Sequence, residues 1–367
     1  MTGTGILRSA TATGLFAVLV LGTVPLDAWR AQAQNGQQNA QQKPPVTVPS
    51  GPSGDAKPAD QYSMTVEVPV VNLDVVVADE KGDIYTGLKK GNFRVSEDGV
   101  VQPLTNFSTP DAPITTVLLI EFSSRGFGGI YAYNAVGWAD YFLHQLKKED
   151  WVALVSFDMR TRIEVDFTQD KMAVHNYLAS MIIPGFHESN VFDALMDTLD
   201  NLKDVKGRKS IVLLASGIDT FSKHTLDQAF KRVKETDVTI FPVGVAEALE
   251  LYLEGHNMIG GAGRLNFYQA DNQMREFAKL TGGHAFFPRF EGEIPGIMQS
   301  IAGMLRSQYS LGYTPTNQAR DGKYRKIKVE VVGEDGKPVE LKDKKGKNLK
   351  LIVYAREGYT APKGPVS

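Results

Sequence analysis

The sequence contains no cysteine, and after its first thirty or so residues it has no long apolar run. The absence of cysteine excludes disulfide staples, thiol catalysis and cysteine-ligated zinc or iron–sulfur sites. A membrane-spanning helix needs roughly 20 consecutive apolar residues, and nothing beyond residue 33 approaches that length. We therefore expect a chain that is stabilised by packing alone and that has no membrane span once its N-terminal segment is removed.

The chain also has little net charge. Its 40 Lys and Arg residues nearly balance 42 Asp and Glu residues, which gives a formal charge of −2. Removal of residues 1–33 takes away two arginines and one aspartate and leaves −3. Such a balance does not favour nucleic acid or an anionic lipid surface as a partner.

Sequence motifs of common enzymes are missing as well. There is no Gly-Lys-Ser/Thr phosphate loop, no His-Glu-x-x-His pair and no Gly-x-Ser-x-Gly elbow. The glycine-rich turn at 126–129 fails the dinucleotide pattern, because Tyr131 stands where the third glycine is required. No motif in the sequence therefore supports assignment to these classes of hydrolase, to the nucleotidases or to the dinucleotide-binding proteins.

The N-terminus has the pattern of a secretory signal peptide. Arg8 precedes an apolar stretch at about 10–24, and Ala31-Gln32-Ala33 has the small residues of a cleavage site. A membrane anchor is the competing interpretation, but the apolar stretch is short and is interrupted by Thr and Gly. We expect export with cleavage near Ala33, to the periplasm or the medium.

Two β-rich segments flank the centre of the chain. Residues 34–62 are mostly Gln, Asn, Pro, Gly and Ser and are expected to form a disordered linker. Apolar and polar residues then alternate up to about 110, and the same alternation returns after Ser307. Each segment is too short to close a sandwich alone, so we expect the two to pair into one split, all-β, immunoglobulin-like sandwich.

Between these segments, apolar strands alternate with amphipathic helices. This alternation predicts an α/β fold with a doubly wound, mainly parallel sheet of the Rossmann-like kind, covered by helices on both faces. The glycine-rich span 255–263 is interpreted from its composition as an inserted, mobile lip. The expected strands are Val117–Phe122, Trp151–Phe157, Arg162–Phe167, Ser210–Ala215, Val238–Val245 and His284–Phe287, and the expected helices are Tyr133–Leu146, Lys171–Met181, Val191–Leu202, Leu226–Lys234, Asn272–Leu280 and Ile294–Leu305.

The first of these strands ends in an acid that is followed by hydroxyls. Open α/β sheets bind ligands at the carboxyl ends of their strands, so this end is a candidate binding site. The stretch resembles the Asp-x-Ser-x-Ser motif of the von Willebrand factor A family, which is the first part of a metal-ion-dependent adhesion site. Glu121 stands at the Asp position, Ser123 at the first Ser, and Arg125 at the second Ser.

The resemblance implies two further loops at the same edge. A Thr that precedes the third helix in this family is replaced by Ser189, which keeps the hydroxyl. The acid that follows the fourth strand is replaced by Ser216, which removes a charge. Asp219 is a candidate to restore a second carboxylate. Serines at strand–helix junctions also commonly cap helices, so a purely structural role for these hydroxyls stays open.

The ligand preferences of Mg²⁺ determine whether these substitutions still allow a metal to bind. Mg²⁺ in proteins usually takes one or two carboxylates plus waters, and the candidate ligands here are Glu121, Ser123 and Ser189. Glu121 is one methylene longer than Asp and is expected to overshoot a site built for the shorter acid. Arg125 has no lone pair to donate and repels a cation, so we expect it to replace the ion by pairing with Glu121. A degenerate site that still binds Mg²⁺ remains the alternative.

The flanking strands extend the resemblance to the exported von Willebrand factor A-related proteins of Acidobacteria. It rests on the order of four segments, none of which is decisive alone. These segments are Phe93–Gln102, Tyr309–Tyr313, Asp321–Val329 and Arg356–Tyr359.

The function implied is that of an exported, non-catalytic adhesion module. Its partner is expected to be a protein or a cell-envelope ligand, bound by Glu121, Ser123, Arg125, Ser189, Ser216 and Asp219. One alternative is a hydrolase that uses Glu121 and Asp219 as a carboxylate pair, and another is an envelope scaffold with a vestigial site. The expected parts are a signal peptide (1–33), a linker (34–62), the first β segment (63–110), the von Willebrand factor A-like domain (111–306), the second β segment (307–360) and a tail (361–367).

Overall fold

A computed structural model describes residues 70–364, apart from 111–112, 125–129, 183–185, 245–260, 340 and 343–347. The described residues belong to one unit, Gln42–Ser367. The predicted signal peptide and linker lie outside them, and so does Arg125. None of the helices among the described residues combines the length and the apolar character that a membrane span requires.

The centre of the chain forms a five-stranded sheet in the order β7-β6-β5-β8-β9. Strands β6, β5, β8 and β9 are parallel, and β7 runs antiparallel at the edge. The prediction of a mainly parallel sheet is therefore confirmed. The strands are β5 (Thr115–Glu121), β6 (Trp151–Phe157), β7 (Thr161–Thr168), β8 (Ser210–Ala215) and β9 (Thr239–Gly244).

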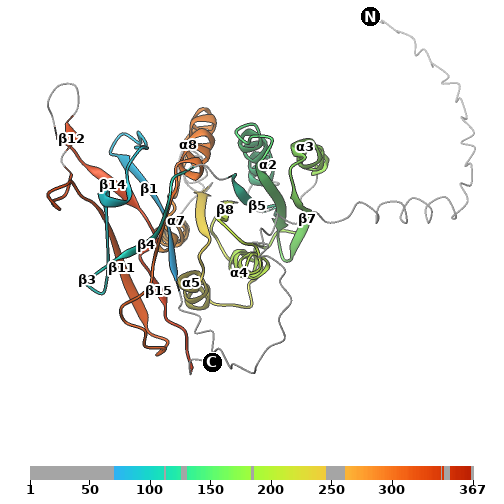
Figure 1. The fold of residues 1–367 in the computed structure, drawn as a ribbon. Coiled ribbons are helices and arrows are strands. Elements are labelled where there is room, and N and C mark those ends of the chain that lie inside the picture. Colours follow the sequence, from blue (N-terminus) through green and yellow to red (C-terminus); the bar gives the residue numbers. More distant parts are fainter. Residues whose placement is uncertain are drawn as a thin grey trace, which may run out of the picture. The chain divides into compact units, whose positions relative to one another are not determined.

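Helices cover both faces of this sheet, because successive side chains of a strand point to opposite sides. Leu118 and Ile120 of β5 are fully buried in a cluster with α2, α3 and α8. Val117 and Leu119 are buried on the other face with α4, α5 and α7. Figure 1 shows α2, α3 and α8 on one side of the sheet and α4 and α5 on the other. The helices are α2 (Ile130–Leu143), α3 (Lys171–Ser180), α4 (Val191–Asn201), α5 (Leu226–Glu235), α7 (Gly261–Thr281) and α8 (Ile294–Arg306), with short 3₁₀ turns at Lys90–Asn92 and Glu291–Glu293.

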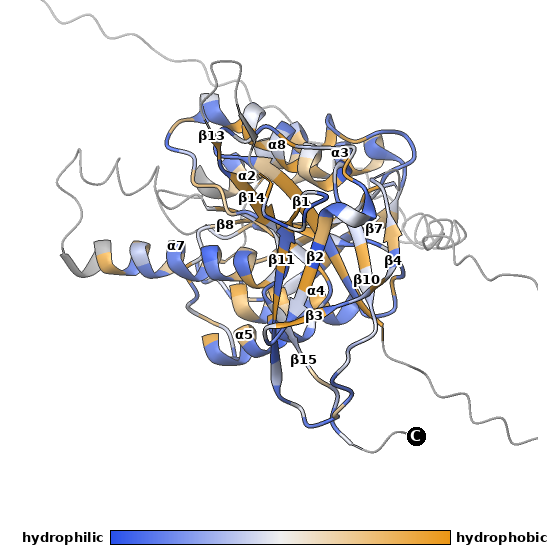
Figure 2. Ribbon diagram, turned by 60° about the vertical axis from the view of Figure 1, so that its left-hand side comes forward, coloured by the Kyte–Doolittle hydropathy of each residue, from blue (hydrophilic) through white to orange (hydrophobic). Residues whose placement is uncertain are grey.

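Two sequence-based predictions need correction here. The expected strand His284–Phe287 is reduced to a single bridge between Phe286 and Val243. Helix α7 is longer than the expected Asn272–Leu280, because residues buried at Phe267, Ala270, Met274 and Phe277 continue one helical face toward the N-terminus. In Figure 2 this end of α7 projects from the body of the protein. The glycines at 261–263 belong to this helix, while the rest of the expected lip lies outside the described residues.

The segments before and after the α/β region pair with each other. Strand β1 (Val71–Asp79) pairs antiparallel with β10 (Tyr309–Tyr313) and with β14 (Leu351–Tyr354), and β2 (Phe93–Glu97) pairs with β11 (Tyr324–Val331). The resulting four-stranded sheets have the orders β14-β1-β10-β4 and β15-β11-β2-β3. Their apolar residues form one buried cluster. The immunoglobulin-like classification of these sheets stays a prediction. The remaining strands are β3 (Val100–Gln102), β4 (Leu104–Ser108), β12 (Leu341–Lys342), β13 (Asn348–Leu349) and β15 (Gly358–Thr360).

Candidate functional site

Polar side chains gather at the carboxyl edge of the parallel strands. Glu121 is the last residue of β5, Ser123 follows two residues later, and Ser216 comes directly after β8. Because β5 and β8 are parallel neighbours, their carboxyl ends lie side by side. All three side chains are buried, with 4 %, 2 % and 2 % of their surface exposed. The sequence-based expectation that these residues share one edge is therefore met by the geometry.

Glu121 joins the first and third loops through hydrogen bonds. The hydroxyl of Ser123 donates to Oε1 at 3.0 Å. The backbone amide and the hydroxyl of Ser216 both donate to Oε2 at 2.7 Å. Three donors thus satisfy one buried carboxylate, as burial of such a group requires.

The extra length of the glutamate has a direct structural use. In the family pattern an acid stands at the position of Ser216, and a shorter Asp stands at that of Glu121. Here Glu121 reaches across to the third loop, where the small Ser216 leaves room for it. The expected overshoot therefore takes the form of a bridge between two loops. In addition, the amide of Ile218 donates to the hydroxyl of Ser216 at 3.2 Å, which fixes that hydroxyl in place.

The second loop brings two buried oxygens to this edge. Ser189 is fully buried and Asn190 is 4 % exposed, and neither Ser189 Oγ nor Asn190 Oδ1 has a hydrogen-bond partner among the described residues. The backbone of Ser189 is nevertheless held firmly. Its amide donates to Thr220 Oγ1 at 3.0 Å, and its carbonyl accepts from the amide of Thr220 at 2.8 Å. The second loop is therefore fixed to the third loop through its backbone, while the side-chain oxygens of Ser189 and Asn190 have no hydrogen-bond partner among the described residues.

Asp219 is used differently from the expectation. Its carboxylate accepts hydrogen bonds from the hydroxyl of Ser222 at 2.5 Å and from the amide of Phe192 at 3.5 Å, near the start of α4. Burial raises the pKa of Asp219 above its ordinary value, although these bonds oppose the rise. Asp219 and Glu121 have no hydrogen-bond partner in common among the described contacts. The carboxylate pair required by the hydrolase alternative stays a prediction without support from these contacts.

One residue of this edge was missed by the sequence analysis. Asp158 follows the last residue of β6, is 1 % exposed, and receives both terminal guanidinium nitrogens of Arg162 at 2.9 and 3.0 Å. Its carbonyl accepts from the amide of Asn190 at 2.8 Å, so it holds the second loop. The sequence carries the signal for this residue, because Asp158 lies directly after the predicted strand Trp151–Phe157.

The donor set can be tested for Mg²⁺. At this edge the described residues offer two neutral oxygens without partners, Ser189 Oγ and Asn190 Oδ1. The two carboxylates are already engaged, because Glu121 accepts three hydrogen bonds and Asp158 pairs with Arg162. No group of three His, Asp or Glu side chains in the described part of the chain could hold a metal ion. A Mg²⁺ site in a protein usually includes one or two carboxylates that are free to bind the ion, and these residues do not supply one. We conclude that these residues do not fit a tight Mg²⁺ site.

The parallel sheet, the flanking helices and the polar loops at one edge define the von Willebrand factor A-like fold. Residues 123–282 match the von Willebrand factor type A domain family. The chain therefore contains a von Willebrand factor A domain within these residues. The match includes Ser123, Ser189, Ser216 and Asp219 and begins two residues after Glu121. A comparison with the curated proteins finds no match.

Several solved structures are similar to this chain. A von Willebrand factor type A protein from Catenulispora acidiphila is 9 % identical, covers 82 % of this chain and 76 % of its own, and has a TM-score of 0.41. The von Willebrand factor domain of the type V pili tip protein Mfa5 from Porphyromonas gingivalis is 12 % identical, with 54 % and 96 % covered and a TM-score of 0.41. Proximal thread matrix protein 1 from the mussel byssus, described with a zinc-occupied MIDAS motif, is 13 % identical, with 57 % and 49 % covered and a TM-score of 0.42. The assignment of the domain rests on the sequence match and on the observed topology.

Proposed function

We propose that this protein is an exported, non-catalytic binding module that engages a protein partner, or another envelope ligand, at the carboxyl edge of its parallel sheet without a metal ion. The domain class supports this proposal, since von Willebrand factor A domains are commonly adhesion or interaction modules. The N-terminal signal pattern supports export. The observation that carries the proposal is the pair of buried, unpartnered oxygens at Ser189 and Asn190 beside a carboxylate that is already satisfied.

The two unpartnered oxygens favour a ligand that donates hydrogen bonds. A buried polar group without a partner costs about 1–3 kcal/mol, so a ligand that satisfies Ser189 Oγ and Asn190 Oδ1 recovers part of that cost. Glu121 needs no such ligand, because Ser123 and Ser216 already bond to it. Because both oxygens are buried, an amide or hydroxyl donor of a partner segment that enters between the loops meets this requirement without a metal ion.

Exposed aromatic side chains flank the same loops. Phe186 and Phe221 are 47 % and 46 % exposed, although both are large and apolar. The carbonyl of Phe186 accepts from the amide of Ser124 at 2.6 Å, and the amide of Phe221 donates to the carbonyl of Ser189 at 2.9 Å. Their backbones are thus anchored to the site while their rings face solvent. Rings of this kind are typical anchors of protein–protein interfaces.

Replacement of these rings is expected to abolish partner capture. We expect the double variant Phe186→Ala with Phe221→Ala to bind its envelope partner at least about tenfold more weakly, because truncated interface anchors commonly cost about 2 kcal/mol or more. The measurement is capture from envelope extract, followed by titration of the captured protein. Val101→Ala is the matched control, because Val101 is 60 % exposed on strand β3 of the antiparallel sheets. Loss of capture in the control alone would favour the scaffold alternative.

Chelation is expected to leave capture unchanged, and the wild-type protein is expected to give no calorimetric signal with Mg²⁺ or Mn²⁺. Restoring the family residues should create the missing site. The variant Glu121→Asp, Arg125→Ser, Ser216→Asp is therefore expected to gain Mg²⁺ binding and a higher melting temperature with Mg²⁺, since bound ligand stabilises the folded state. The same variant with Ser189→Ala tests whether the second-loop hydroxyl takes part. Tight Mg²⁺ binding by the wild-type protein would overturn the metal-free proposal.

A further inference from the structure

A second polar site lies away from the loops described above. A cleft of about 1040 Å³ is formed by one face of the sheet that contains β1, β10 and β4 and by the loop Lys203–Lys209. This loop ends where β8 begins, whereas Ser216 follows the end of β8. The cleft is therefore at the amino edge of the parallel sheet, opposite the proposed binding edge.

One wall of the cleft is a regular polar surface. The apolar residues Leu73, Leu311 and Phe107 belong to the core side of their strands, so the residues that alternate with them point to the cleft. Strand register places these polar residues in two rows across three strands. The rows are Asn72, Gly312 and Asn106, and Asp74, Ser310 and Ser108.

The centre of this wall is hollow because Gly312 has no side chain. A Cβ atom at Gly312 would lie 2.9 Å from Asn106 Cβ and 3.3 Å from Asn72 Oδ1. The glycine thus leaves space between two amide side chains. In the other row, Asp74 accepts a hydrogen bond from the hydroxyl of Ser310 at 2.9 Å, which orients its carboxylate. The wall therefore offers amide, hydroxyl and carboxylate groups around a recess.

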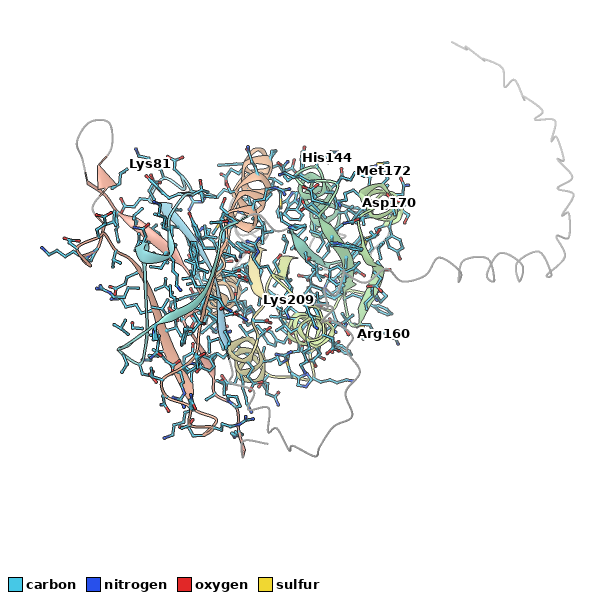
Figure 3. The ribbon with its side chains drawn as sticks, in the orientation of Figure 1. Lys81, His144, Arg160, Asp170, Met172 and Lys209 are labelled. Atoms are coloured by element: carbon cyan, nitrogen blue, oxygen red, sulfur yellow. The ribbon has the colours of Figure 1, made fainter. Side chains whose placement is uncertain are left out.

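The opposite wall is basic. Lys203, Lys206, Arg208 and Lys209 all line the cleft, together with the acid Asp237. Lys209, labelled in Figure 3, is buried and is held by the carbonyl of Val205 at 2.8 Å and by Asp237 at 3.2 Å. Lys203 pairs with Asp200 at 2.8 Å, while Lys206 is exposed in the described structure. The wall opposite the polar sheet thus carries both cations that are held by ion pairs, Lys203 and Lys209, and an exposed cation, Lys206.

We infer that this cleft binds the uronic acid units of an acidic saccharide. Asp74 and the side-chain oxygens of Asn72 and Asn106 accept hydrogen bonds, so the ligand must carry several hydrogen-bond donors, as the hydroxyls of a sugar ring do. The basic loop pairs with an anionic group, and a carboxylate suits both lysine and arginine. A sugar acid combines these features in one ring. The cleft, at about 1040 Å³, is close to the upper limit of the usual range for small-ligand sites, about 300–1,000 Å³, so it has room for a ligand of a few rings.

Other ligands fit the two walls less well. A nucleotide would need an aromatic surface for its base, but Phe107, the one aromatic residue of the lining, belongs to the core side of its strand. A free phosphate would leave the acceptors of the sheet wall unmatched. A zwitterionic peptide could pair with both charges, but it carries one backbone N–H donor per residue, which is fewer than the hydroxyl donors of a sugar ring. The peptide and the phosphate serve as comparison ligands in the test, together with a neutral sugar.

The test is calorimetric titration of the full-length protein with a trimer of galacturonic acid. We expect binding by the trimer, and about tenfold weaker binding by maltotriose, by triglycine and by inorganic phosphate. The variant Asn72→Ala with Lys206→Gln is expected to bind the trimer about tenfold more weakly, while Lys231→Gln, at an exposed position of α5 outside the cleft, is expected to bind normally. Absence of trimer binding, equal binding of maltotriose, or an unaffected double variant would each overturn the inference.

The pH dependence of trimer binding distinguishes this site from a nonspecific basic patch, which would not show it. Burial raises the pKa of Asp74 to about 6, while Ser310, Arg208 and Arg356 oppose the rise and Asp237 adds to it. Below pH 6 Asp74 becomes neutral, whereas a uronate with a carboxyl pKa of about 3.5 stays anionic at pH 5. We expect trimer binding to be about threefold tighter at pH 5 than at pH 7, because one like charge is removed. Asp74→Asn should abolish this difference, and a difference that persists in this variant would contradict the assignment.

Discussion

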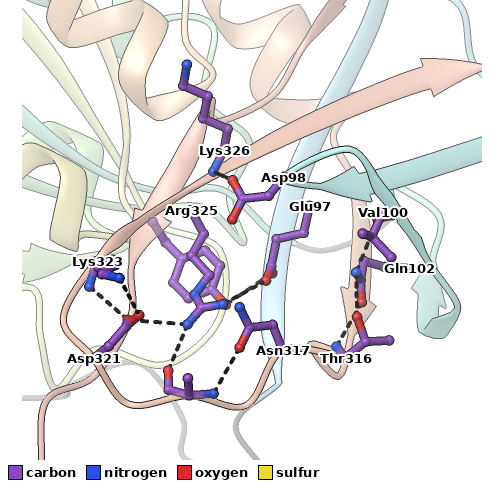
Figure 4. A network of polar contacts seen from close by, with 12 residues as sticks. Glu97, Asp98, Val100, Gln102, Thr316, Asn317, Asp321, Lys323, Arg325 and Lys326 are labelled. Atoms are coloured by element: carbon purple, nitrogen blue, oxygen red, sulfur yellow. Dashed lines mark hydrogen bonds and ion pairs between the residues drawn. The ribbon is translucent and has the colours of Figure 1, made fainter.

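Arg325→Met is expected to destabilise the protein by about 3–5 kcal/mol, because it removes one member of a buried ion pair. Arg325 of β11 and Glu97 of β2 are both about 2 % exposed in their side chains, and their charged atoms lie 3.7 Å apart. Figure 4 shows this pair within a wider polar network at one end of the antiparallel sheets. Without the guanidinium, Glu97 remains as a buried charge without a cation.

The surrounding contacts explain why this pair is retained. Tyr313 and Tyr359 donate to Glu97 Oε2 at 2.8 and 3.1 Å. Burial, together with the neighbouring Glu97, raises the pKa of both tyrosines, so their hydroxyls stay protonated and remain donors. Arg325 in turn donates to the carbonyl of Ala319 at 2.8 Å and lies 3.3 Å from Asp321. The network therefore joins the strand β2, which precedes the α/β region, to β10, β11 and β15, which follow it.

Urea unfolding followed by circular dichroism measures this effect. Lys328→Met is the control on the same strand, because Lys328 is 70 % exposed and pairs only with Glu330 in the described contacts. Its loss is expected to cost no more than about 1 kcal/mol. The double variant Arg325→Met with Glu97→Gln should recover part of the lost stability, since a neutral amide still accepts from the tyrosines. A loss below about 1 kcal/mol in Arg325→Met, or no recovery in the double variant, would contradict the role assigned to the pair.

The parallel strands were the part of the fold that the sequence predicted best. The expected ranges Trp151–Phe157 and Ser210–Ala215 coincide with β6 and β8. Strands buried on both faces are continuous apolar runs with sharp polar ends, so their limits are visible without any knowledge of their neighbours. Helix α7 is longer than predicted because two glycines at its start, Gly261 and Gly263, lower helix propensity, and because few apolar residues mark its projecting end.

The site was predictable in its position but not in its connections. Any acid or hydroxyl directly after a parallel strand must lie at the carboxyl edge, which placed Glu121, Ser123 and Ser216 correctly. Which of these groups bond to one another depends on loop conformation. Asp219 illustrates this limit, because a turn of three residues after Ser216 carries its carboxylate to Ser222 and to the start of α4. The partnerless oxygen of Asn190 likewise has no signal in the sequence.

Gly283→Ala is expected to cost about 3 kcal/mol or more, since added side-chain atoms in a packed interior commonly cost about 1–3 kcal/mol and this contact is with backbone. A Cβ atom at Gly283 would lie 1.9 Å from the carbonyl oxygen of Ile240 in β9. The neighbouring contacts prevent a simple retreat. The amide of Gly283 donates to the carbonyl of Ala278 at 2.9 Å, and the amide of Ile240 donates to Thr281 Oγ1 at 3.0 Å.

Gly282, which precedes Gly283, also packs too closely against its neighbours to accept a side chain. Gly282 has a φ of +79°, and a Cβ atom there would lie 2.6 Å from the amide nitrogen of Arg356, just after β14. Gly282 therefore lets the end of α7 approach the antiparallel sheets, whereas Gly283 lets it approach the parallel sheet. Both alanine variants are expected to be destabilised, Gly282→Ala through strained backbone as well as close contact.

A helical glycine with free space around it should respond in the opposite direction. Gly137 lies inside α2, and a Cβ atom there meets nothing within 4 Å. Gly137→Ala is expected to stabilise the protein by about 0.5–1 kcal/mol, because alanine loses less conformational freedom in a helix. The melting temperatures of Gly282→Ala, Gly283→Ala and Gly137→Ala are the measurement. They separate the cost of a steric clash from the effect of adding a methyl group where there is space for it. Equal melting temperatures for Gly283→Ala and Gly137→Ala would show that the end of α7 can move away from β9, and that its close packing is not required for the fold.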